Sequence, residues 1–105
     1  MPEARAVAAA LGLRVEIEDL GDWGPAALVA EYDPCGRVIR INARAVAEFR
    51  AAHDGDAAEL ERFVDTAIAH EIYHHREAAG DVRRLRSRAG REAAADAYAR
   101  ALVAQ

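Results

Sequence analysis

The chain of 105 residues is 52% hydrophobic and 30% charged, which predicts one globular domain over residues 1–105 and excludes a disordered chain. Its formal net charge of −4 argues against direct nucleic-acid binding. No apolar run approaches the ~20 residues of a membrane span, and the N-terminus lacks a signal-peptide pattern, so we expect a cytoplasmic protein without membrane contact. The single cysteine, Cys35, excludes an internal disulfide and a Cys-rich zinc site.

The first half of the chain predicts a short helix followed by strands. Pro2 can open a helix that runs to about Leu11. Alternating or β-branched runs then predict three strands, at 13–18, 26–32 and 37–41. The loop at 21–25 separates the first two strands, and the turn at 33–36 joins the last two into a hairpin. Trp23 in the loop is expected to anchor the core rather than to line a groove.

The second half of the chain is predicted to be helical. The three expected helices are 43–53, 56–79 and 89–103. Asn42 can cap the first helix, and Asp56 with Glu59 forms a capping box for the second. Gly80 should end the second helix. Residues 81–87 have no clear prediction.

Two histidines and a glutamate share one face of the long helix in the pattern H-E-x-x-H. His70 and His74 lie one turn apart, because each helical residue advances by about 100°. Their imidazoles can hold a zinc ion from one side, and Glu71 can accept a proton from an activated water. The pattern is typical of zinc metallopeptidases. For these five residues alone, a helix with two ordinary histidines is the alternative.

The last helix offers a third ligand, since a catalytic zinc takes three protein ligands and a water. Glu92 and Asp96 lie one turn apart on it. We expect Glu92 to bind the metal and Asp96 to accept a hydrogen bond from the outer nitrogen of His70. Close approach of the two helices is expected from small residues, at Ala93, Ala95 and Ala99. The alternative for both carboxylates is a solvated helical stripe.

H-E-x-x-H followed by E-x-x-x-D resembles the gluzincin metallopeptidases, and the flanking residues resemble the ImmA/IrrE group within them. The similar stretches are residues 39–42, 69–75 and 95–103. The resemblance implies an α+β fold: a small zincin-like domain with a short, mostly antiparallel sheet packed on an active-site helix and a C-terminal ligand helix. It also implies one Zn²⁺ ion held by His70, His74 and Glu92, with Glu71 as the general base.

The resemblance further implies a protein or peptide substrate that adds to the sheet edge as an extended strand. Members of the group act on or regulate DNA-binding repressors, so such a repressor is a candidate substrate. The sequence therefore predicts a zinc-dependent endopeptidase with narrow specificity for a regulatory protein. Two alternatives stay open: a latent or inactive zinc-binding module that acts through protein–protein binding, and a helical interaction domain without metal.

Two further sets of residues have no assigned role. The side chains chemically able to stabilise an oxyanion are Tyr32, Tyr73, Tyr98, His53 and His75. Tyr73 stands where the group often has a small residue, which predicts a crowded cleft floor.

A basic cluster consists of Arg83, Arg84, Arg86, Arg88 and Arg91. It could grip an acidic partner or a phosphate backbone, but a solvated face is the commoner explanation for such a run.

Overall fold

The computed structural model describes residues 4–22 and 28–104. Its helices are α1 (Ala4–Ala10), α2 (Ala43–Ala52), α3 (Ala57–Ala79) and α4 (Arg88–Val103). Its strands are β1 (Arg14–Glu18), β2 (Ala30–Asp33) and β3 (Val38–Asn42). The predictions for Pro2, for Trp23 and for residues 26 and 27 of the second strand fall outside the described residues.

The fold is α+β, as predicted, but its sheet is mixed. The strand order is β1-β3-β2. β2 and β3 form the expected antiparallel hairpin, whereas β1 pairs with β3 in parallel. The expectation of a mostly antiparallel sheet was therefore wrong. A tight turn forces the two strands that it joins to be antiparallel. The chain between β1 and β2 is longer, spanning residues 19–29, so it does not fix the direction in which β1 pairs with β3.

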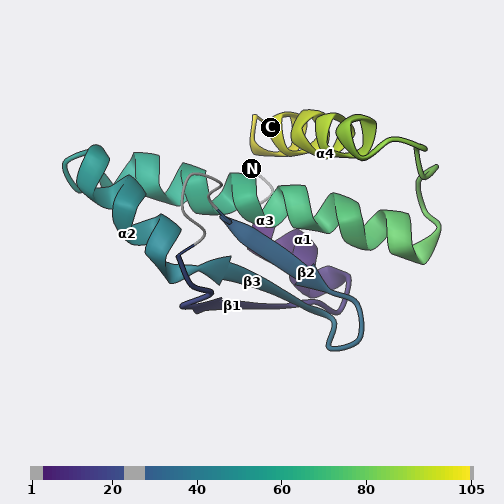
Figure 1. Cartoon of the computed structure of the whole chain (residues 1–105), viewed down its shortest axis with the longest axis horizontal. Coiled ribbons are helices and arrows are strands. Elements are labelled where there is room, and N and C mark those ends of the chain that lie inside the picture. The colour runs from purple at the N-terminus through teal and green to yellow at the C-terminus, as the bar shows by residue number, and fades with distance from the viewer. Residues whose placement is uncertain (1–3, 23–27, 105) are drawn as a thin grey trace.

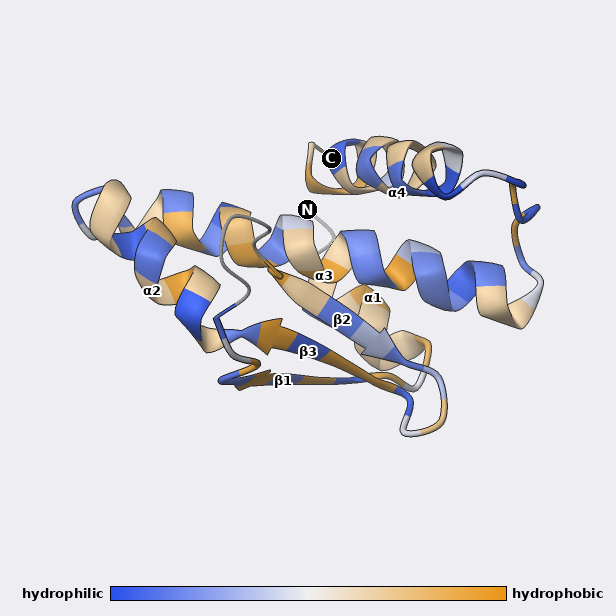
Figure 2. Ribbon diagram, in the orientation of Figure 1, coloured by the Kyte–Doolittle hydropathy of each residue, from blue (hydrophilic) through white to orange (hydrophobic). Residues whose placement is uncertain are grey.

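Helix α3 is the central element of the fold. The sheet and α1 lie on one side of it, and α4 lies on the other (Figure 1). Hydrophobic residues follow β3 through the middle of the sheet (Figure 2). Ile39 and Ile41 of β3 and Ile68 and Ile72 of α3 are fully buried in one cluster. Burying a side chain of this size contributes about 1.5–3 kcal/mol, so these four residues hold α3 firmly against the sheet.

Asn42 joins the sheet to α2 and to the preceding loop. Its Oδ1 accepts hydrogen bonds from the backbone N–H groups of Arg44, as the predicted cap requires, and of Leu20. Its Nδ2 donates to the carbonyl oxygens of Gly21 and Leu28. One buried amide thus closes both ends of the segment that leads into β2.

The ends of α3 follow the sequence prediction except for the Glu59 half of the capping box, because the backbone N–H of Asp56 donates to the carbonyl oxygen of His53 instead. Asp56 accepts hydrogen bonds from the backbone N–H groups of Ala58 and Glu59. Gly80 ends the helix with φ of 82°, a left-handed conformation that glycine adopts without strain.

The start of α4 depends on a cap that the sequence analysis did not single out. Ser87 Oγ accepts a hydrogen bond from the backbone N–H of Gly90 at 2.9 Å. A Cβ atom on residue 90 would stand 2.8 Å from that oxygen, so glycine leaves the space that the cap needs. Ala95 and Ala99 are buried as predicted for a close approach to α3, whereas Ala93 is exposed and takes no part.

Candidate metal centre

The two motif histidines of α3 point their Nε2 atoms at the same place. These atoms lie 3.1 Å apart, and the ring centroids are 4.9 Å apart. Ligand atoms of His70, Glu71 and His74 all lie within 4.8 Å of one another, a spacing that could hold a metal ion. The helical spacing therefore produces the convergence that the sequence predicted.

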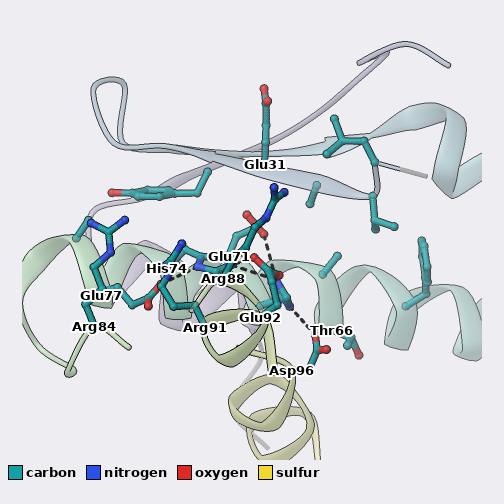
Figure 3. Close-up of a pocket in the computed structure, with 18 residues that line it drawn as sticks. Glu31, Thr66, Glu71, His74, Glu77, Arg84, Arg88, Arg91, Glu92 and Asp96 are labelled. Carbon is teal, nitrogen blue, oxygen red and sulfur yellow. Dashed lines mark hydrogen bonds and ion pairs between the residues drawn. The ribbon is translucent and has the colours of Figure 1, made fainter. Parts of the chain in front are cut away.

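Helix α4 brings Glu92 to the same point (Figure 3). Its Oε2 lies 2.8 Å from Nε2 of His70, and its Oε1 lies 3.3 Å from Nε2 of His74. The carboxylate thus contacts the inward nitrogens of both histidines. It is far from them in the sequence, and the packing of α4 on α3 supplies the contact.

The outward nitrogen of each histidine contacts a different carboxylate. Nδ1 of His70 lies 2.8 Å from Oδ1 of Asp96, the pairing that the sequence predicted. Nδ1 of His74 lies 2.8 Å from Oε1 of Glu77. A proton held at Nδ1 would leave the Nε2 lone pair free to bind a metal, so these outward contacts favour the metal-binding tautomer of both rings.

Glu77 is a residue of the candidate site that the sequence analysis did not single out. It lies three residues after His74, a spacing that places two side chains together on a helix, and this signal could have identified it. Its side chain is only 7% exposed, and its Oε2 has no hydrogen-bond partner among the described residues. Burying a carboxylate is costly without a partner, so the His74 contact accounts for its position.

Glu71 sits deeper than the histidines on either side of it. The residue is 7% exposed, and its Oε2 lies 4.0 Å from Nε2 of His70. Burial raises the pKa of the Glu71 carboxyl, and the nearby His70 and His74 oppose that rise. A carboxylate with a raised pKa is a stronger base near neutral pH, which suits the predicted role in proton transfer.

A cavity of about 850 Å³ lies over these residues. Strand β2 forms one wall, α3 forms the floor, and the start of α4 with the segment before it forms the opposite wall.

Tyr73 does not line the cavity, and its ring lies 5.8 Å from that of Tyr98. The predicted crowding of the cleft floor by Tyr73 is therefore wrong.

The five candidates for oxyanion stabilisation do not gather at the metal-binding cluster. Tyr32 is the one that lines the cavity. Its hydroxyl lies 2.7 Å from Nδ1 of His75, and burial lowers the pKa of that imidazole. His75 itself is buried, at 7% exposed. His53 stacks on Phe49 at the end of α2 and takes no part in the cavity.

Strand β2 is an edge of the sheet and lies along the cavity. Among the strands in residues 4–22 and 28–104, it pairs with β3 alone. Ala30, Glu31 and Tyr32 line the cavity. An edge strand beside a metal-binding cluster can accept a peptide in extended form.

Comparisons with known proteins add no family to this description. The chain matches no protein-family model, no curated protein and no solved structure. In the described part of the chain, no helix combines the length and the apolar character that crossing a bilayer requires. The resemblance to the ImmA/IrrE group rests on the motif residues and stays a prediction.

Proposed function

We propose that this chain is a zinc-dependent endopeptidase of the gluzincin type that cleaves a regulatory protein in the cytoplasm. The observation that carries the proposal is that both motif histidines have carboxylate contacts on their inner and their outer ring nitrogens. The Nε2 atoms of His70 and His74 meet Glu92, while Asp96 and Glu77 hold the two Nδ1 atoms. An unrelated helix with two ordinary histidines has no reason to pair both outer nitrogens with carboxylates.

The residues present fit a zinc ion. Two neutral imidazoles and one carboxylate are a donor set of catalytic zinc sites, which keep one position open for water. His70, His74 and Glu92 would hold the ion. When bound, zinc would supply Lewis-acid activation of a water molecule and of the peptide carbonyl.

The remaining steps belong to the protein side chains. Glu71 would accept the proton of the attacking water at its carboxylate and then deliver it to the leaving amine. Its burial favours both transfers, because the raised pKa brings the acid and base forms closer in energy at neutral pH. The substrate would lie extended along β2, where backbone hydrogen bonds orient it across the cavity. A DNA-binding repressor is the candidate substrate that the family resemblance suggests.

One observation favours a second candidate function, a zinc-binding module that does not cleave. Of the five residues considered for oxyanion stabilisation, Tyr32 lines the cavity, but its hydroxyl contacts His75. A site without an oxyanion donor would lose about 2.7–4 kcal/mol of transition-state stabilisation. Such a protein would act through partner binding.

The test is elemental analysis of protein purified without affinity metals or chelators, beside His74→Ala. The proposal expects about one zinc per chain, lost in the variant. No zinc, even after zinc is added, would refute both the endopeptidase and the zinc-binding module. Cleavage of mixed peptides and DNA-binding repressors by the loaded protein then separates the two functions.

A further inference from the structure

The five arginines of the basic cluster do not share one environment. Arg84, Arg88 and Arg91 line the cavity above the candidate metal centre, whereas Arg83 and Arg86 do not. The cluster is therefore not a uniform solvated face. Arg84 of the segment between α3 and α4 and two arginines of the first turn of α4, Arg88 and Arg91, thus bring positive charge to the site.

Arg91 has an internal role. Its Nη1 donates hydrogen bonds to the carbonyl oxygens of Leu85 and Arg86, at 3.2 and 3.1 Å. These bonds tie the segment before α4 to the first turn of that helix. The guanidinium of Arg91 is thus engaged in holding the cavity wall.

Arg84 and Arg88 have no such engagement. Both are exposed, and neither makes a hydrogen bond or ion pair with any residue in 4–22 or 28–104. Their side chains extend into the space between β2 and α3 (Figure 3). Two positive charges therefore face the cavity without a protein carboxylate.

Each carboxylate that lines the cavity contacts a basic side chain through at least one oxygen, and Oε2 of Glu77 has no hydrogen-bond partner among the described residues. Asp96 and Glu92 contact His70, Glu77 contacts His74, and the longer contacts are Glu31 with Arg40 at 3.5 Å and Glu71 with His70 at 4.0 Å. None of the five is paired with Arg84 or Arg88. A bound divalent ion would add further positive charge to the same cavity.

We propose that Arg84 and Arg88 bind a carboxylate of the substrate. The guanidinium is always charged and its planar donors match a carboxylate, so an exposed pair at the rim selects an anionic group over a neutral one. The carboxylate is either the side chain of Asp or Glu near the scissile bond or a free C-terminus. This inference rests on the proposed function, because it names the substrate class of the same site.

The probes are short peptide hydroxamates, which bind a zinc ion without needing turnover. One pair has blocked ends and carries Glu or its neutral counterpart Gln. A second pair carries neutral side chains and ends in a free carboxylate or in an amide. Titration calorimetry with zinc-loaded protein measures the ratio of dissociation constants within each pair, at low and at high salt.

The wild-type protein should prefer the acidic member of one pair by about tenfold at low ionic strength, as expected for a charge-assisted hydrogen bond at an exposed site. Added salt should reduce that preference. The double variant Arg84→Gln/Arg88→Gln should bring the ratio close to one. The matched variant Arg83→Gln/Arg86→Gln removes the same charge at nearby positions that do not line the cavity, and it should keep the preference. A preference within the Glu/Gln pair would identify a side-chain carboxylate as the ligand, and a preference within the carboxylate/amide pair would identify a free C-terminus.

Three results would overturn the inference while the proposed function stands. One is equal binding of both members in each pair by the zinc-loaded wild-type protein. Another is an equal loss of preference in the two double variants, which would indicate a general basic surface. The last is an equal weakening of all probes by Arg84→Gln/Arg88→Gln, which would show that these residues contact a group shared by all probes rather than the distinguishing carboxylate.

Failure of the proposed function has a different signature. If elemental analysis finds no zinc in the wild-type protein, both proposals fall together. If zinc is bound and the acidic preference is present but no peptide bond is cleaved, the carboxylate site stands and the endopeptidase activity is refuted.

Discussion

Glu77 accepts a hydrogen bond from Nδ1 of His74 at 2.8 Å, and it does so from a largely buried position on the same helix. Asp96 makes the equivalent contact with His70 from α4, but its side chain is 57% exposed. One histidine is therefore positioned within α3 and the other across two helices. The two carboxylates should differ in how strongly they support metal binding.

Glu77→Ala should lower zinc affinity by about tenfold to a hundredfold, because His74 loses the partner that holds its tautomer and ring orientation. Chelator competition titrations measure the change. Ala78, the exposed next residue, provides a control as Ala78→Gly, adjusted for any change in helix stability. An affinity equal to that of the wild-type protein would show that Glu77 does not support His74.

Asp96→Ala should also lower zinc affinity, by a smaller factor within the same range of about tenfold to a hundredfold. The loss is smaller because water can replace an exposed carboxylate as the acceptor for Nδ1 of His70. The same titration compares the two variants directly. A larger loss for Asp96→Ala than for Glu77→Ala would contradict the ranking by burial.

Glu71→Gln should retain zinc and lose peptide cleavage, because the amide keeps the size of the side chain and cannot accept the proton. Zinc content and cleavage of whichever peptide the wild-type protein hydrolyses are measured on the same preparation. Glu61→Gln, at an exposed position on α3, is the matched control and should keep both properties. Cleavage by a zinc-loaded Glu71→Gln protein would remove Glu71 from the mechanism.

Asn42→Ala should lower the free energy of unfolding by about 2 kcal/mol or more, because four backbone groups lose a hydrogen-bond partner. Urea unfolding followed by circular dichroism measures the loss. Asn42→Asp keeps the acceptor for the helix cap and loses both donors, so it should fall between the wild-type protein and Asn42→Ala. Equal stability of all three proteins would show that the amide does not hold the loop.

The hairpin turn should make stability depend on acid pH through Asp33. A hydrogen bond from the backbone N–H of Gly36 lowers the pKa of Asp33 below its ordinary value of 3.8, with a smaller contribution from Arg40. The stabilisation is thus complete above that ordinary value and is lost as the pH falls through the lowered pKa of the folded protein. The stability difference between the wild-type protein and Asp33→Asn should shrink over that range in urea unfolding. A difference that stays constant as the pH falls would rule out a charge effect.

Local signals accounted for much of the second half of the chain. The cap at Asn42, the capping residue Asp56 and the end at Gly80 involve groups a few residues apart, so their pattern is readable without the fold. The convergence of His70 and His74 has the same origin. The contact of Glu77 with His74 has the same local origin, since Glu77 lies one turn after His74 on the helix.

The sequence by itself determined the order of helices and strands, the bounds of the long helix and the pairing of two histidines on one face, because local periodicity and helix geometry set these within a few residues. Only the tertiary structure decided the parallel pairing of β1, the contact of Tyr32 with His75 and the division of the arginines between cavity and solvent. Each of these joins segments far apart in the chain, and their relative position follows from how α3, α4 and the sheet bury a shared apolar surface. The contact of Glu92 with both histidines belongs to the same class: the sequence suggested the residue, and the packing of α4 on α3 placed it.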